Sequence, residues 1–147
     1  MTLYYEDLPV GYEQTVGTHR MNKAEMLSFA GKWDPQDFHV DPEAAEDTVH
    51  EGIIASGLHT IGAATRLMVD NFLDEAANQG GLGIDNLRFH RAVEPGDRLT
   101  VSHEVVGRRV SDSDPDRGIV EREIRVTDAD GEPVATWETA ILMERQG

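Results

Sequence analysis

The sequence predicts an α+β fold in which one antiparallel sheet wraps a long central helix. Residues 53–76 form a run rich in Ala, Leu, Met and Ile with a single arginine, which is typical of a buried helix. From residue 84 onward, apolar and polar residues instead alternate with a period near two, as they do in strands. A buried helix followed by consecutive strands favours a sheet packed against that helix.

A first, shorter helix is predicted from a capping pattern. Asn22 is followed three residues later by Glu25, which is the spacing of a capping box. Apolar side chains then recur at helical spacing as far as Trp33, where we expect this helix to end. A strand near residues 13–20 is expected to precede it and to join the sheet.

The central helix is predicted to run from Ile53 to about Ala76, which corresponds to roughly 36 Å. Its first half is apolar almost all round, so we expect burial against the sheet. The stretch NQGGLG at residues 78–83 is expected to break the helix. Because its glycines follow a helix rather than a strand, we interpret them as a terminator and not as a loop that holds nucleotide phosphates.

Four strands are predicted in the second half of the chain. Clusters of Pro, Gly, Asp and Ser separate them, so we expect an antiparallel meander. The predicted strands are residues 84–93, 97–110, 118–129 and 133–145. At 147 residues the chain is expected to form one domain over residues 1–147.

Composition excludes several classes of function. The chain has 28 acidic and 13 basic residues and a formal net charge of −15, which disfavours a nucleic-acid partner. No apolar run is long enough to span a membrane, the first residues lack a signal-peptide pattern, and there is no cysteine. We expect a soluble cytoplasmic protein without membrane association. The acidic excess fits a high-salt cytoplasm or an acidic mesophilic protein, which unfolding midpoints at low and high KCl would distinguish.

Residues 33–42, WDPQDFHVDP, hold three aspartates and one histidine. Asp41 precedes a proline, which is the pattern of a helix N-cap, and Asp37 suits a turn. Asp34 and His39, five positions apart, have no such structural explanation. They are therefore the candidate catalytic pair.

Three stretches, taken together, resemble one known family. They are WDPQDFHVDPEAA, VHEGIIASGLHT and GIDNLRFHRAVEPGDRLTV, in this order along the chain. In type and separation they resemble the MaoC-like dehydratases, a hot-dog-fold family that includes (R)-specific enoyl-CoA hydratases. The likeness extends from about Tyr5 to Met143. It implies a single hot-dog domain that hydrates a trans-2-enoyl thioester, or catalyses the reverse dehydration, without a cofactor.

The resemblance also implies roles for particular residues. The catalytic Asp and His of the family carry over to Asp34 and His39, which would share one water and move its protons. Backbone N–H groups at the start of the central helix would stabilise the negative charge that develops on the thioester oxygen. Many relatives read His-Gly where this chain reads His50-Glu51-Gly52, so Glu51 and Gly52 are both oxyanion candidates.

Pocket and coenzyme contacts are expected nearby. Gln36, Ser56 and His59 are the candidate pocket residues, although a histidine at the position of His59 more often serves helix packing than catalysis. Five arginines lie between residues 88 and 109, and Arg88 and Arg91 are the candidates for binding the phosphates of coenzyme A. The alternative is that these arginines pair with neighbouring acids.

An open sheet edge and the family pattern together imply a homodimer or a higher homo-oligomer. No metal is expected, because the spacing fits neither a calcium loop nor a zinc site. Two alternative functions stay open. One is a hot-dog acyl-CoA thioesterase in which Glu51 activates water, and the other is a non-catalytic acyl-binding subunit.

Overall fold

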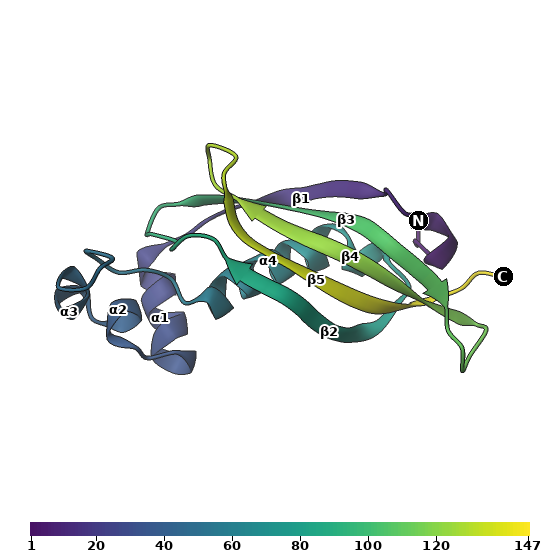
Figure 1. The fold of residues 1–147 in the computed structure, drawn as a ribbon, viewed down its shortest axis with the longest axis horizontal. Helices are drawn as coiled ribbons and strands as arrows, with labels where there is room; N and C mark the ends of the chain where they lie inside the picture. The colour runs from purple at the N-terminus through teal and green to yellow at the C-terminus, as the bar shows by residue number, and fades with distance from the viewer.

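The computed structural model describes residues 1–147 and consists of a five-stranded antiparallel sheet curled around one long helix (Figure 1). The strands, in the sheet order β1-β3-β4-β5-β2, are β1 Glu13–Arg20, β2 Asn78–Phe89, β3 Arg98–Val110, β4 Arg117–Thr127 and β5 Pro133–Glu144. The helices are α1 Lys23–Trp33, α2 Asp37–Val40, α3 Pro42–Glu46 and α4 Gly57–Asn71, with single 3₁₀ turns at Tyr5–Asp7 and Leu73–Glu75. The predicted fold class is confirmed. None of these helices is long and apolar enough to cross a bilayer.

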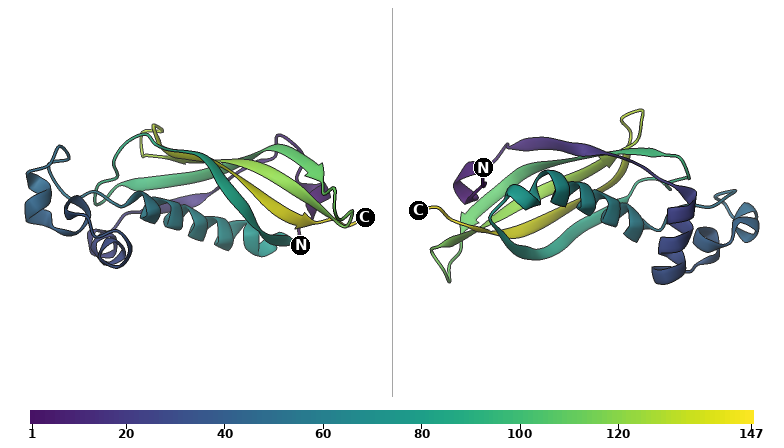
Figure 2. Two further views of the ribbon diagram at one scale, coloured as in Figure 1. Left: turned by 60° about the horizontal axis from the view of Figure 1, so that its bottom comes forward. Right: turned by 180° about the vertical axis from the view of Figure 1, so that it is seen from behind.

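The core lies between α4 and the concave face of the sheet (Figure 2). Strand β4, and β3 from Leu99 to Val105, bury every second residue, because successive side chains of a strand point to opposite faces. Helix α4 contributes Ala64 and Met68, and Phe72 follows it with no exposed surface. The period of two in the sequence therefore arises because only one face of the sheet packs against the helix.

Helix α4 begins at Gly57, not at Ile53 as the sequence predicted, and it ends at Asn71. Residues 53–56 are extended instead. The backbone N–H of Ile54 donates to a carbonyl of α2 at 3.0 Å, and that of Ala55 donates to a carbonyl of the β2–β3 connection at 2.8 Å. These bonds hold the segment between two other parts of the chain, so its apolar composition reflects burial rather than helix.

The stretch NQGGLG was predicted to terminate the central helix, and this prediction is wrong: it forms the first half of β2. Its pairing with β5 shifts register between Asn78 and Gly80 and again between Gly81 and Gly83. Gly80 and Gly83 have φ values of 127° and 156°, which residues other than glycine rarely adopt. The glycines therefore permit bulges that bend a strand, a role that composition alone does not separate from a turn.

The predicted meander is confirmed only for β3, β4 and β5. Strand β2 pairs with β5 rather than with β3, the next strand along the chain, and β1 pairs with β3. Strands β1 and β2 are thus the two edges of the sheet. The connection from β2 to β3 therefore forms no hairpin, and its backbone hydrogen-bonds to Ala55, which precedes α4, and to Met21, which follows β1.

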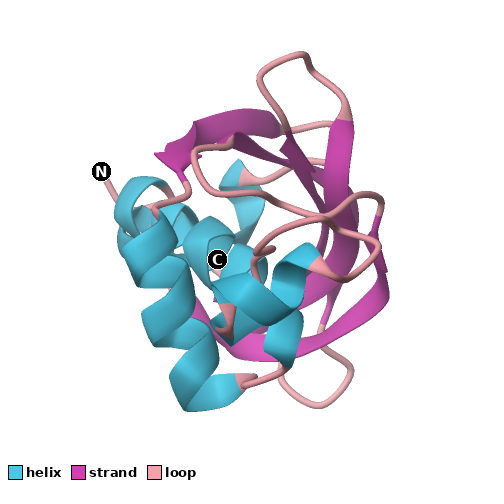
Figure 3. Cartoon of the chain, turned by 90° about the vertical axis from the view of Figure 1, so that its left-hand side faces the viewer, coloured by secondary structure: helices cyan, strands magenta, loops and turns pink.

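The short helices gather at one end of the sheet, beside the start of α4 (Figure 3). Asn22 caps α1 as predicted, accepting from the N–H of Glu25 at 3.0 Å. The Glu25 carboxylate does not return to that cap but contacts His59 Nε2 at 3.0 Å. Asp41 caps α3 as predicted, and Asp37 is the first residue of α2.

Two polar side chains, His103 and Arg122, are buried in the core with only 2% and 3% of their surfaces exposed. Arg122 Nη1 donates to His103 Nδ1 at 3.1 Å, so the ring carries its hydrogen on Nε2, which lies 3.2 Å from Gln14 Oε1. Burial, reinforced by the charge of Arg122, lowers the pKa of His103 to about 3. The ring therefore stays neutral in the folded protein.

The neutral state of His103 predicts a pH dependence of stability. In the unfolded chain His103 takes up a proton as the pH falls below 6.5, whereas in the folded protein it does so only near pH 3. The unfolded state binds more protons in that window, so acid lowers the free energy of unfolding by up to about 1.4 kcal/mol per pH unit. We expect His103→Gln to show a shallower decline below pH 6.5 in urea titrations. Equal slopes for both proteins would contradict this assignment.

Candidate active site

Asp34 ends helix α1, where its backbone N–H donates to the carbonyl of Ala30 at 2.8 Å. Its two carboxylate oxygens accept separate hydrogen bonds, Oδ1 from Gln36 Nε2 and Oδ2 from Ser56 Oγ, each at 2.7 Å. These bonds, from Gln36 first and then Ser56, lower the pKa of Asp34, because they favour the charged form. Asp34 is therefore a carboxylate at neutral pH.

His39 lies in α2 and is almost fully buried. Its Nδ1 lies 2.8 Å from the carbonyl oxygen of Ile54. A carbonyl only accepts, so Nδ1 carries hydrogen. The other nitrogen, Nε2, lies 3.4 Å from Asp34 Oδ2. In the neutral ring, Nε2 therefore presents a lone pair beside the carboxylate.

This arrangement suits activation of a water molecule. A water at a hydrogen-bond distance of about 2.8 Å from both His39 Nε2 and Asp34 Oδ2 is geometrically possible, because the two atoms are only 3.4 Å apart. Both atoms are acceptors, so both hydrogens of that water would be engaged. Either group can take a proton from the water and return it elsewhere.

A cavity of about 260 Å³ opens beside this pair. Its walls are mainly apolar, and His39 and Gln36 supply polar groups. The residues around it are Gln36, Phe38, His39, His50, Ile54, Ala55, Gly57, Thr60, Phe89, Arg91, Ala92, Val93 and Val134. A Cβ atom at Gly57 would lie 2.3 Å from the Phe89 ring, so glycine permits this close approach of helix and strand.

The oxyanion candidates from the sequence lie outside the cavity wall. Glu51 has a φ of 57°, and its N–H donates to the carbonyl of Thr48 at 3.1 Å. Neither Glu51 nor Gly52 lines the cavity, whereas Gly57 does. Gly57 is the first residue of α4, and its N–H has no partner within the chain. The displaced helix start moves the available backbone donor to Gly57.

The predicted pocket residues separate into two groups. Gln36 and Ser56 both hold Asp34. His59 is turned elsewhere: its ring stacks on Phe29 at 4.8 Å between centroids and its Nε2 contacts Glu25. It lines a different cavity, between α1 and α4. The structure thus brings together all the predicted pocket residues except His59.

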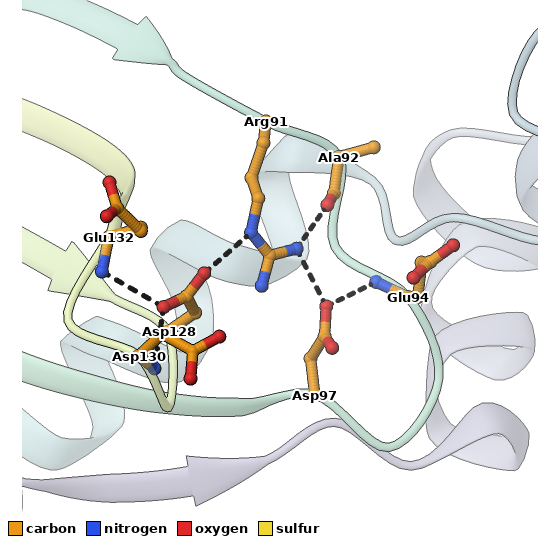
Figure 4. A network of polar contacts seen from close by, with 7 residues as sticks. All are labelled: Arg91, Ala92, Glu94, Asp97, Asp128, Asp130 and Glu132. Carbon is orange, nitrogen blue, oxygen red and sulfur yellow. Dashed lines mark hydrogen bonds and ion pairs between the residues drawn. The ribbon is translucent and has the colours of Figure 1, made fainter.

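Arg91 lines the cavity beside Asp34 and His39 but is already paired (Figure 4). Its Nη1 lies 2.9 Å from Asp97 and its Nε lies 3.1 Å from Asp128. Burial works to lower the pKa of Arg91, but the bonds and charges of the two aspartates outweigh it and raise that pKa. Arg91 therefore ties the β2–β3 connection to the β4–β5 turn, the pairing that the sequence left open.

The remaining arginines of this region do not form one patch. Arg88 is exposed and forms no ion pair, its Nη1 donating to the carbonyl of Leu87 at 3.3 Å. Arg98 and Arg109 lie at opposite ends of β3, roughly 36 Å apart at strand spacing. Arg108 donates to the carbonyl of Tyr5 at 3.0 Å. Arg88 has no ion pair and directly precedes Phe89, which lines the cavity.

Sequence reasoning did not anticipate His50, Thr60 and Phe89 as cavity residues. Thr60 follows Gly57 by three positions, so its place was readable from helical spacing once the helix start was known. Phe89 and His50 depend on tertiary packing, for example the edge-on contact of His50 with the ring of Phe38 at 5.6 Å. No local pattern carries that information.

Comparison with known proteins agrees with this geometry. Residues 8–127 match the model of the MaoC like domain. This chain belongs to the MaoC-like family. Its sheet curled around one helix is the hot-dog fold, and the family relationship supports hydratase or dehydratase chemistry in general.

Three relatives illustrate the relationship. The MaoC-like dehydratase from Rhodospirillum rubrum is 36% identical, with a TM-score of 0.91 and 99% of each chain covered. The R-hydratase PhaJ1 from Pseudomonas aeruginosa is 25% identical, with a TM-score of 0.80, covering 99% of this chain and 88% of that one. The uncharacterized protein YdeM from Bacillus subtilis is 28% identical over 104 residues, 71% of this chain and 74% of YdeM.

Ser56 has two separable roles in this MaoC-like site, which a pair of variants can test. Its Oγ donates to Asp34 and accepts from the N–H of Leu58 at 3.2 Å. We expect Ser56→Ala to destabilise the protein by about 1 kcal/mol through loss of the cap and to raise the pKa of Asp34, measured from carboxyl ¹³C shifts. Asn22→Ala removes a comparable cap from α1 without touching Asp34. It should cost similar stability and leave that pKa unchanged, and an unaltered Asp34 pKa in Ser56→Ala would refute the coupling.

Proposed function

We propose that this protein is an enoyl-thioester hydratase, which adds water across the trans-2 double bond of an enoyl-CoA to give a 3-hydroxyacyl thioester, or catalyses the reverse dehydration. One observation carries the proposal. A carboxylate with a lowered pKa, Asp34, lies 3.4 Å from the free Nε2 of His39 beside a mainly apolar cavity. The family relationship agrees with this chemistry.

The reaction needs no redox step and no cofactor. The water oxygen bonds to C3 while a proton leaves it for Asp34 or His39, and the electrons of the double bond move onto the thioester as an enolate. The protonated group then returns the proton to C2. Each proton transfer of this kind contributes about 10²- to 10⁴-fold to the rate. The hydrogen bond from His39 Nδ1 to Ile54 keeps Nε2 directed at the water.

We assign the enolate oxygen to the backbone N–H of Gly57. This donor is free, lies at the N-terminus of a 15-residue helix and borders the cavity, where the helix dipole favours negative charge. The roles predicted for Glu51 and Gly52 are less well supported, because neither borders the cavity. The exposed Arg88 is our candidate for the phosphates of coenzyme A.

The assignment also includes a homodimer formed through β2. This edge strand exposes Leu82, Ile84 and Phe89, each by about half of its surface. An uncovered edge of this kind favours pairing with a second copy. Static light scattering that detects only monomer would defeat this part of the proposal.

The thioesterase alternative lacks such support. It requires a carboxylate at the thioester carbonyl, and Glu51, the residue considered for this role, does not border the cavity. Measuring free thiol with a thiol reagent, while following the enoyl absorbance, distinguishes the two activities. Thiol release without hydration would favour the thioesterase.

Substitution of the proposed pair tests the central assignment. We expect Asp34→Asn and His39→Gln each to lower kcat by about 10²- to 10⁴-fold in a hydration assay that follows loss of enoyl-thioester absorbance. Asp37→Asn is the matched control, because Asp37 is an exposed aspartate in the same segment with no contact to the pair. Wild-type rates for both substituted pair members would refute the assignment. A wild-type protein that binds acyl-CoA without hydrating it, and binds it equally in both variants, would instead favour a non-catalytic acyl-binding subunit.

A further inference from the structure

A second cavity lies between α4 and the sheet, beyond the catalytic cavity. Its volume is about 320 Å³, and its walls include Ile61 and Met68 of α4 and Trp137 of β5. Most of its surface is apolar. Arg122 is the one charged side chain that lines this cavity, and only 3% of its surface is exposed.

Arg122 has no acidic partner. Its Nη1 donates to Met68 Sδ at 3.6 Å and to His103 Nδ1 at 3.1 Å, and its guanidinium lies 5.1 Å from the centroid of the Phe72 ring. Burial lowers the pKa of Arg122 only to about 10, so it is charged at neutral pH. His103 supplies a hydrogen bond but no charge.

Arg122 is the only buried arginine of the chain, and no carboxylate pairs with it. Six other arginines lie within 4.0 Å of a carboxylate even though they are far more exposed, and the chain has 28 acidic residues to supply partners. The paired arginines are Arg66, Arg91, Arg109, Arg117, Arg125 and Arg145. An unpaired buried charge is costly, so retention of Arg122 in the core points to a role in binding.

The free donors of Arg122 have a definite geometry. Nε is buried and has no hydrogen-bond partner, and both hydrogen bonds of the guanidinium run through Nη1. Nε and Nη2 remain, and they form the side-on edge of the guanidinium. Two parallel N–H groups of this kind match the two oxygens of a carboxylate.

The second cavity continues the line of the first. Gly57 and Thr60 border the catalytic cavity, while Ile61 and Met68 border the second, on the same flank of α4. Strands β2 and β5 line both cavities as well. From Thr60 to Met68 the helix advances about 12 Å. An acyl group extending along α4 from the catalytic pair would therefore meet Arg122.

We propose that the second cavity binds the far end of an acyl group that carries a terminal carboxylate, and that Arg122 pairs with this carboxylate through Nε and Nη2. This inference rests on the proposed function, because it assumes that the thioester lies in the catalytic cavity. It narrows the substrate class to enoyl thioesters with an ω-carboxylate.

Paired substrates test the inference directly. The wild-type protein should hydrate an ω-carboxy-enoyl-CoA with a kcat/KM about 10- to 100-fold above that for the methyl-terminated enoyl-CoA of equal length, the range that charged hydrogen bonds support. Arg122→Met should reduce this ratio to about one. Arg125→Met is the matched control, because Arg125 lies on the same strand, is exposed and pairs with Glu123 at 2.7 Å; it should leave the ratio unchanged.

A binding measurement is independent of hydration. Decanoate should raise the Tm of the wild-type protein, decanol should raise it less, and the decanoate effect should be lost in Arg122→Met. If that variant does not fold, Arg122→Lys keeps the charge but removes the side-on pair of donors, and it should lose most of the effect. If no enoyl thioester is hydrated, the proposed function fails, while the decanoate shift still tests the site.

Three results would overturn the inference. The first is equal kcat/KM for the two substrates in the wild-type protein. The second is a decanoate shift that persists in Arg122→Met. The third is an Arg122→Met variant whose homodimer is weakened, together with a wild-type protein whose Tm decanoate does not change. In that case Arg122 would pair with a carboxylate of a second copy of the chain and not with a substrate.

Discussion

The site depends on four consecutive residues, 54–57, that are held extended and then turn into helix α4. The carbonyl of Ile54 orients His39 through Nδ1, the hydroxyl of Ser56 holds Asp34, and the N–H of Gly57 is left free at the helix start. Backbone bonds to α2 and to the β2–β3 connection fix this segment from both sides. One short segment therefore positions His39, Asp34 and the free N–H of Gly57, which the proposed reaction needs. If α4 began at Ile53 as predicted, these three contacts would be lost.

Charge is used differently on the surface and in the core of this acidic protein. Arg91, which lines the cavity beside Asp34 and His39, is held by two aspartates and joins two turns, so it stiffens the cavity wall. Arg122 is more deeply buried and is surrounded by sulfur, an aromatic ring and a neutral imidazole. The first arrangement satisfies its charge within the chain. The second leaves a cation facing an apolar cavity, which is an arrangement suited to recognition rather than to stability.

Much of the fold was predictable because its patterns are local. The caps at Asn22 and Asp41, the period of two in the strands and the buried central helix all follow from neighbouring residues. The helix start was mispredicted because long-range hydrogen bonds override the helical preference of an apolar run, and β2 was shortened because bulge glycines resemble turn glycines. In the site, Asp34 and His39 were accessible from spacing and family likeness. The side-chain bond from Ser56 to Asp34 and the pairing of Arg91 were not, because they join residues far apart in sequence.

The most direct test of this account is a crystal structure of the protein with a bound 3-hydroxyacyl-CoA. The account predicts that the 3-hydroxyl oxygen lies about 2.8 Å from both Asp34 Oδ2 and His39 Nε2, with the thioester oxygen on the N–H of Gly57. A thioester bound elsewhere, or a 3-hydroxyl in contact with neither side chain, would contradict it.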